Sequence, residues 1–204
     1  MSIQSIQEKV ENTIIIEKSK FITYLLPVFN IQEIEDQLEI FRRQHKEATH
    51  VCYGWILNNN GILSFKSSDD GEPSSTAGAP ILNGLKKNHL ENILCIVVRY
   101  FGGIKLGAGG LSRAYGKSCL EAIKKAVLVQ WVEADVYELS IPYNQEKNFL
   151  QYLKFYNVSI LLKKYQLEIM YTIAFYQTKD LLKIKNDIGI ELKESFLYKK
   201  WLKM

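Results

Sequence analysis

Apolar residues along the first half of the chain follow the two-residue period of strands and the longer period of helices in turn. The segments 12–18 and 21–29 are rich in β-branched and aromatic residues and predict two paired strands. Asn30 and Glu33 have the spacing of a capping box, and apolar residues then recur at helical intervals. We therefore expect a helix from this point to about residue 46.

A hairpin, a short helix and a buried strand follow. Segments 51–57 and 62–66 flank an Asn-Gly pair, which is a strong hairpin signal. We expect a loop over 67–76 and a short helix over 82–90. The unbroken apolar run 93–98 is typical of a strand buried on both faces, which predicts that it lies at the centre of a sheet.

The rest of the chain begins with a helix whose apolar stripe runs from Leu111 to Val127 and ends near residue 129. A regular alternation follows. We expect a strand over 132–141, a helix from the cap Asn144 to about residue 156, and strands over 158–165 and 167–176. A helix over 180–188, capped by Thr178, and a strand over 190–201 should complete the chain. The order βαββαβ is that of the split βαβ, or ferredoxin-like, fold.

Glycine and aromatic residues divide the chain near Gln130. Eleven of the 12 glycines precede this point, whereas 14 of the 24 aromatic residues fall in the last 74 positions. We therefore predict an α+β protein with one domain over 1–130 and a ferredoxin-like domain over 131–204.

Composition excludes several classes of protein. With 47% apolar residues, the chain is not dominantly disordered, and a net charge of +4 is too small to indicate nucleic-acid binding by itself. Three cysteines without a CxxC pair argue against a disulfide framework or a structural zinc site. No apolar run approaches 18 residues and no signal peptide is evident, so we expect a cytoplasmic protein with no membrane association.

Five glycines fall within the nine residues 102–110, between the buried strand and the following helix. Such a segment exposes backbone N–H groups next to a helix N-terminus, which suits an anion. The candidate phosphate-binding residues are Arg99, Lys105, Gly107, Gly109, Gly110, Arg113 and Lys117. Alternatively, the glycines only allow a tight turn. The sequence 116–118 resembles the end of a P-loop but lacks the required upstream glycine and lies inside the expected helix.

An acidic loop contains Asp69, Asp70 and Glu72. Its carboxylates have the chemistry to hold Mg²⁺ or to act as acid and base, but the sequence is also ordinary turn chemistry, in which Ser75 or Thr76 caps the next helix. His50 and Cys52 face the same way on a strand, and we assign them to a packed core rather than to a metal. We expect no metal, no cofactor and no catalytic residue.

Six tyrosines lie on the expected strands of the second domain or at their ends: Tyr137, Tyr143, Tyr165, Tyr171, Tyr176 and Tyr198. A ferredoxin-like sheet with exposed aromatics can stack nucleic-acid bases. Strand tyrosines are also common as half-buried partners within a sheet. Motifs of the RNA-recognition type are absent, which favours the second interpretation and leaves base stacking as the alternative.

Several ordered motifs closely resemble the YigZ/IMPACT family. They are DDGEP at 69–73, TAG at 76–78, RYFGG at 99–103, LG at 106–107, GGL at 109–111 and RAY at 113–115. KSKFI at 18–22 and ATH at 48–50 also match, so the resemblance covers about residues 10–128. One departure is Ser75, where the family usually has glycine.

The resemblance implies a first domain similar to a domain of a small-subunit ribosomal protein, and a second similar to a domain of elongation factor G. Eukaryotic relatives act in translational control through an additional N-terminal domain, and that role does not transfer. We therefore expect a non-catalytic protein that binds RNA or the ribosome. The alternatives are a Mg²⁺-dependent enzyme acting on a phosphorylated small molecule and a module that binds a partner protein.

Overall fold

A computed structural model describes residues 2–59, 61–188 and 193–203 and confirms the α+β class. The chain forms two compact units, of which the first runs to Trp131 and the second from Val132 to Leu202. Each unit has its own apolar core. Among the described residues, no helix is both long enough and apolar enough to cross a bilayer.

The first unit is built on an antiparallel sheet in the order β2-β3-β6-β4-β5. Its strands are β2 (Val10–Ile16), β3 (Ser19–Pro27), β4 (His50–Asn59), β5 (Ile62–Ser68) and β6 (Ile93–Tyr100), preceded by the unpredicted strand β1 (Ser2–Ile6). The apolar run predicted to be central is β6, which pairs with β3 on one side and β4 on the other. The predicted hairpin is β4–β5.

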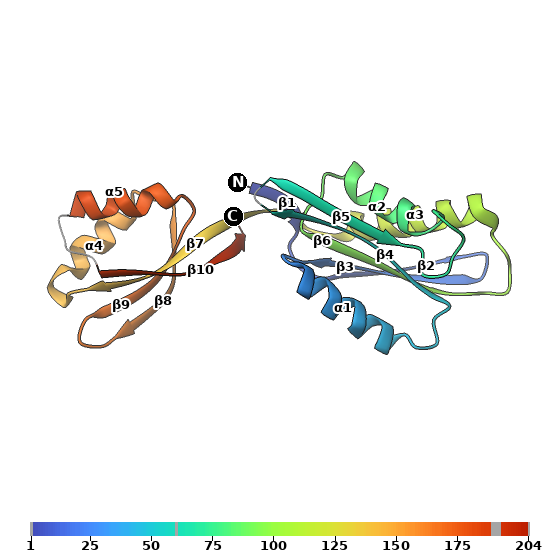
Figure 1. Cartoon of the computed structure of the whole chain (residues 1–204), viewed down its shortest axis with the longest axis horizontal. Helices are drawn as coiled ribbons and strands as arrows, with labels where there is room; N and C mark the ends of the chain where they lie inside the picture. Colours follow the sequence, from blue (N-terminus) through green and yellow to red (C-terminus); the bar gives the residue numbers. More distant parts are fainter. Residues whose placement is uncertain (1, 60, 189–192, 204) are drawn as a thin grey trace. The chain divides into compact units, whose positions relative to one another are not determined.

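Helices cover both faces of this sheet (Figure 1). Helix α1 (Ile31–Gln44) packs on one face, and α2 (Gly78–Lys87) and α3 (Gly107–Lys125) pack on the other. Successive residues of β6 alternate between the two cores. Leu94, Ile96 and Val98 join the core under α1, whereas Cys95 and Val97 join the core under α2 and α3.

The capping box of α1 is confirmed, because the Asn30 side chain accepts a hydrogen bond from the Glu33 N–H at 2.9 Å. The Glu33 carboxylate in turn accepts from the Phe29 N–H at 2.8 Å. The prediction for α2 was wrong at its start, since the helix begins at Gly78 rather than at residue 82. Helix α3 begins at Gly107, inside the segment that we predicted to be a loop.

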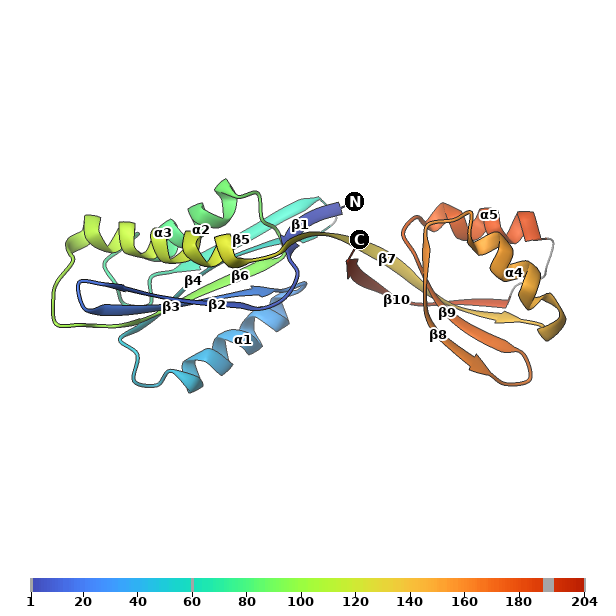
Figure 2. The same ribbon diagram turned by 180° about the vertical axis from the view of Figure 1, so that it is seen from behind.

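The second unit has the ferredoxin-like order of elements. It comprises β7 (Leu128–Ile141), a 3₁₀ turn (Tyr143–Gln145), α4 (Glu146–Leu153), β8 (Val158–Tyr165), β9 (Ile169–Phe175), α5 (Thr178–Ile188) and β10 (Lys193–Lys203). The strand order is β10-β7-β9-β8, and both helices lie on one face of the sheet, as Figure 2 shows. Residues 190–192 of the predicted last strand lie outside the described residues.

Candidate functional site

The site is built at the end of β6, where strand register aligns three side chains. Arg99 pairs with Phe21 of β3 on one side and with His50 of β4 on the other. Because strand residues alternate between faces, Arg99 follows Cys95 and Val97 on the face that α2 and α3 cover. Arg99 is therefore the charged last member of a row on β6 that is otherwise apolar and buried.

Arg99 is buried, and its charge is neutralised by Glu72 of the acidic loop. The Arg99 Nη1 atom lies 2.6 Å from Glu72 Oε1, and both side chains are almost fully buried. The hydroxyl of Tyr115 on α3 donates to the same carboxylate oxygen at 2.8 Å. Burial raises the pKa of Tyr115, and the neighbouring Cys52 and Glu72 add to the effect, so this tyrosine stays a neutral donor.

Asp69 has a structural role that the sequence did not reveal. Its carboxylate accepts hydrogen bonds from the N–H groups of Ser75, Ala77 and Gly78 at 2.8 to 2.9 Å. Burial disfavours the charged carboxylate, but these three bonds outweigh that effect and lower the pKa of Asp69. The cap of α2 is therefore Asp69. The prediction of a Ser75 or Thr76 cap was wrong, since the Thr76 hydroxyl donates to the Pro73 carbonyl at 2.6 Å.

Asp70 fixes the position of His50. The Asp70 carboxylate accepts from the Val51 N–H at 2.6 Å and lies 3.9 Å from the exposed Arg42. The Asp70 carbonyl is 2.7 Å from His50 Nδ1; since a carbonyl only accepts, Nδ1 carries the hydrogen. His50 Nε2 then lies 3.8 Å from Glu72 Oε1.

Each of the three carboxylates in the acidic loop thus has protein partners, which weakens the Mg²⁺-dependent alternative. No group of three or more His, Cys, Asp or Glu residues suited to a metal occurs in the described part of the chain. Cys52 donates to the Asp69 carbonyl at 3.0 Å, and burial raises its pKa to about 12. The thiol therefore belongs to the packed core, as we predicted.

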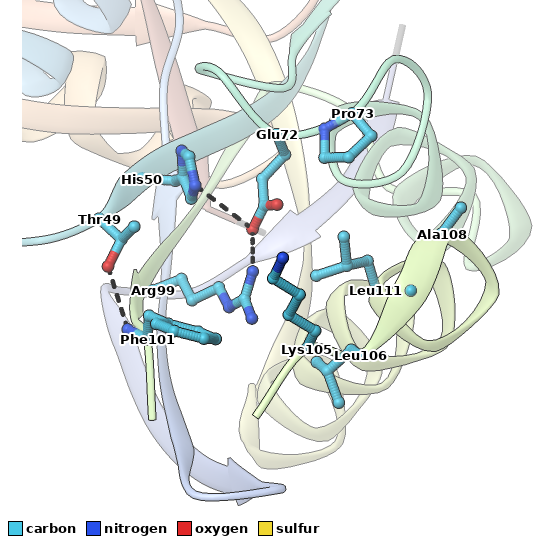
Figure 3. A pocket seen from close by; sticks show the side chains of 11 residues that line it. Thr49, His50, Glu72, Pro73, Arg99, Phe101, Lys105, Leu106, Ala108 and Leu111 are labelled. Atoms are coloured by element: carbon cyan, nitrogen blue, oxygen red, sulfur yellow. Dashed lines mark hydrogen bonds and ion pairs between the residues drawn. The ribbon is translucent and has the colours of Figure 1, made fainter. Parts of the chain in front are cut away.

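The acidic and glycine-rich segments meet at one cavity of about 330 Å³, drawn in Figure 3. Its lining comes from β4, the acidic loop, the end of β6 and the start of α3: Thr49, His50, Glu72, Pro73, Arg99, Phe101, Lys105, Leu106, Gly107, Ala108 and Leu111. The side chains of Glu72, Arg99 and Lys105 point toward one another in this view. A polar cluster therefore faces apolar walls.

The predicted phosphate-binding residues occupy three environments. Arg99 is buried, whereas Lys105 is exposed and lines the cavity. Arg113 and Lys117 are exposed on α3, where the P-loop-like sequence also lies. Gly107, Gly109 and Gly110 form the first turn of α3, so the expectation that all five glycines lie in the loop was wrong for these three.

Sequence reasoning did not select His50, Tyr115 or Phe101 for the site. The prediction of a packed core was wrong for His50, which is the first residue of β4, pairs with Arg99 and lines the cavity. Nothing local in the sequence linked it to the acidic loop. Tyr115 falls on the apolar stripe of its helix and is fully buried. Its hydroxyl reaches the site only because α3 packs against β3 and β6.

The departure at Ser75 has a structural consequence, because this residue has a φ of 61°. The left-handed region is strained for a residue with a Cβ and is open to glycine. We expect Ser75→Gly to raise the free energy of unfolding by about 0.5 kcal/mol, the relief of strain being partly offset by the greater freedom of the unfolded chain. Thermal unfolding measures this, with Ser74→Gly as the control that should not stabilise.

Comparisons with known proteins agree with the motifs. The Impact N-terminal domain model matches residues 17–123. An IMPACT family member of Haemophilus influenzae is 37% identical over 155 residues, which cover 76% of this chain and 75% of that protein. The IMPACT family member YvyE of Bacillus subtilis is 46% identical over 126 residues, 62% of this chain and 58% of that protein.

The two-unit architecture has a counterpart among solved structures. The crystal structure of a hypothetical protein superposes with a TM-score of 0.66 at 28% identity and covers 97% of this chain and 98% of that one. The family model matches more than half of the chain, and the Haemophilus influenzae relative is matched over three quarters of its length. The chain therefore belongs to the IMPACT family.

Proposed function

We propose that the protein binds RNA, free or within the ribosome, through the surface around the N-terminus of α3, and that it does so without catalysis. The observation that carries this proposal is the state of that helix end. No side chain among the described residues caps it, and no acidic residue lies in its first turn. Its N–H groups and positive end of the dipole are therefore available to a phosphate.

Cations surround this helix end. Lys105 lies two residues before α3, and Arg113 and Lys117 lie about two and three turns into the helix. Neither Lys105 nor Arg113 forms an ion pair with any residue that the structure describes. Exposed cations without acidic partners favour binding to a polyanion, because phosphates then displace only counterions.

The second unit offers aromatic surface for the same ligand. Tyr143 and Tyr165 are exposed, and their rings stack with centroids 6.4 Å apart. The Lys163 ammonium lies 4.4 Å from the centroid of the Tyr165 ring. Lys163 also pairs with the Glu146 carboxylate at 2.5 Å, so the exposed rings rather than this cation carry the inference. Exposed aromatic rings suit unpaired bases, and we infer that single-stranded RNA is the preferred form.

The cellular setting is part of the proposal. The family resemblance implies one domain similar to a domain of a small-subunit ribosomal protein and one similar to a domain of elongation factor G. These two likenesses support a cytoplasmic role in translation, with the ribosome as the source of RNA. A partner protein is the alternative ligand. It would be recognised with little dependence on salt, whereas phosphate contacts make affinity fall steeply as salt rises.

We expect the double substitution Lys105→Glu and Arg113→Glu to weaken binding of a single-stranded RNA by at least about tenfold at low salt. The slope of log affinity against log salt should become shallower by about 1.4, since each lost contact to single-stranded RNA removes about 0.7. Fluorescence anisotropy over a series of salt concentrations measures both quantities.

The matched control is the double substitution Lys124→Glu and Lys125→Glu, at the other end of α3, about 27 Å along the helix axis from Gly107. It makes the same charge change on the same element and should leave the slope unaltered. Equal losses for the control and the variant at Lys105 and Arg113 would show that only net charge matters, and unaltered affinity in the latter would overturn the site assignment.

A further inference from the structure

The buried guanidinium of Arg99 has an unused donor. The residue is only 5% exposed, Nη1 donates to Glu72, and Nη2 lies 3.4 Å from the Ser19 hydroxyl. The Nε–H has no hydrogen-bond partner among the residues that the structure describes. Leaving a buried donor unpaired is unfavourable, and the guanidinium that carries it lines the cavity, where an additional acceptor would offset this loss.

The charge around the cavity favours an anion. Arg99 and Lys105 contribute two positive charges, and Glu72 contributes one negative charge. The N-terminus of the 19-residue helix α3 adds the positive end of its dipole through Gly107 and Ala108, which also line the cavity. Figure 3 shows the Arg99 and Lys105 side chains pointing into this space from different segments.

The remaining walls favour a flat apolar group next to that anion. Phe101 is 47% exposed and lines the cavity, and the Arg99 guanidinium lies 5.5 Å from the centroid of its ring. Leu106 and Leu111 add aliphatic surface. A volume of about 330 Å³ lies at the small end of the range for ligand pockets, which suits one nucleotide rather than a run of them.

We propose that this cavity binds a nucleotide that carries a terminal phosphate, with the phosphate at the N-terminus of α3 between Lys105 and Arg99 and the base against Phe101. The inference rests on the proposed function where the nucleotide is the end of an RNA chain. It stands apart from that function where the nucleotide is free. The protein would then select phosphorylated ends among the RNAs that its exposed cations hold.

The test compares ligands that differ only at the end. Decamer RNAs with a 5′-phosphate, a 3′-phosphate or no terminal phosphate are titrated by anisotropy, and adenosine monophosphate is titrated by calorimetry. We expect one phosphorylated decamer to bind about tenfold more tightly than the unphosphorylated one, as one additional charge-assisted contact provides. Adenosine monophosphate should compete for the same site.

A matched pair of variants locates the effect. Ala108→Glu places a carboxylate where the phosphate is expected, and it should remove the preference, whereas the equally large but neutral Ala108→Gln should keep it. An acidic residue in the first helical turn is favourable, so both variants are expected to fold, which a melting curve verifies.

Each outcome bears on the proposal. Equal affinities for the three decamers, together with no heat from adenosine monophosphate, overturn it while leaving general RNA binding intact. Adenosine monophosphate binding without RNA binding supports the cavity and rejects the proposed function. If both Ala108 variants lost the preference to the same degree, the size of the new side chain rather than its charge would be the cause. The phosphate assignment would then be wrong.

Discussion

Replacing Glu72 with alanine is expected to lower the free energy of unfolding of the first unit by about 3–5 kcal/mol. The carboxylate is the only hydrogen-bonding acidic partner that the described residues offer to the buried Arg99, and it also accepts from Tyr115. Among the described residues, its removal leaves the buried Arg99 charge with only the Ser19 hydroxyl as acceptor, and it leaves the buried Tyr115 hydroxyl without its acceptor. Both groups are buried, so water compensates these losses only in part.

Hydrogen exchange at the amides of β6 measures this effect, because it reports on the first unit separately from the second. Tyr115→Phe is the control for the hydroxyl alone, and its expected loss is about 1 kcal/mol. The double variant Glu72→Ala and Arg99→Met removes the buried charge together with its partner, and it should recover most of the stability. A loss below 1 kcal/mol for Glu72→Ala would contradict the burial of the pair.

The elements whose signals are local were predictable. The capping box at Asn30 and Glu33, the Asn-Gly hairpin and the apolar run of β6 each lie within a few residues, and each formed where we expected it. The alternation of elements in the second unit likewise predicted its ferredoxin-like order. In these cases local preference and tertiary packing agree, so a short window of sequence is enough to predict the element.

The features that were not predictable depend on contacts between distant positions. Helix α2 begins early because Asp69, eight residues before Ala77, folds back to cap it. From the sequence, Arg99 was expected to be a free phosphate-binding cation. Its charge is neutralised by Glu72, which lies 27 positions away in the chain. The acidic and glycine-rich motifs were both visible, but only the pairing of β4 with β6 brings them to one cavity.

Gly102 follows β6 and packs against the turn between β2 and β3. Gly102→Ala is expected to destabilise the first unit by about 3 kcal/mol or more. A Cβ at this position would lie 2.0 Å from the Lys18 carbonyl carbon and 2.4 Å from the Ser19 nitrogen. Both are backbone atoms of the turn between β2 and β3, so no side chain can rotate away. Either the turn or the segment that positions Phe101 must move.

Gly103 and Gly116 provide the controls for this effect. At Gly103, with a φ of 88°, an added Cβ would meet nothing within 4 Å, so alanine should cost only the left-handed strain of about 1–2 kcal/mol. At Gly116, inside α3, the nearest atom to an added Cβ is Pro80 Cβ at 3.8 Å, so alanine should stabilise the helix by about 0.5–1 kcal/mol.

Hydrogen exchange at β6 therefore should rank the three alanine variants with Gly102 least stable, Gly103 intermediate and Gly116 above the unmodified protein. The Gly103 variant has a left-handed φ without a clash, and the Gly102 variant has a clash without a left-handed φ, so the two variants report on strain and on steric overlap separately. If the Gly102 variant were no less stable than the Gly103 variant, the turn between β2 and β3 would have to yield freely. In that case the segment that carries Phe101 would not be held rigidly beside the buried Arg99–Glu72 pair.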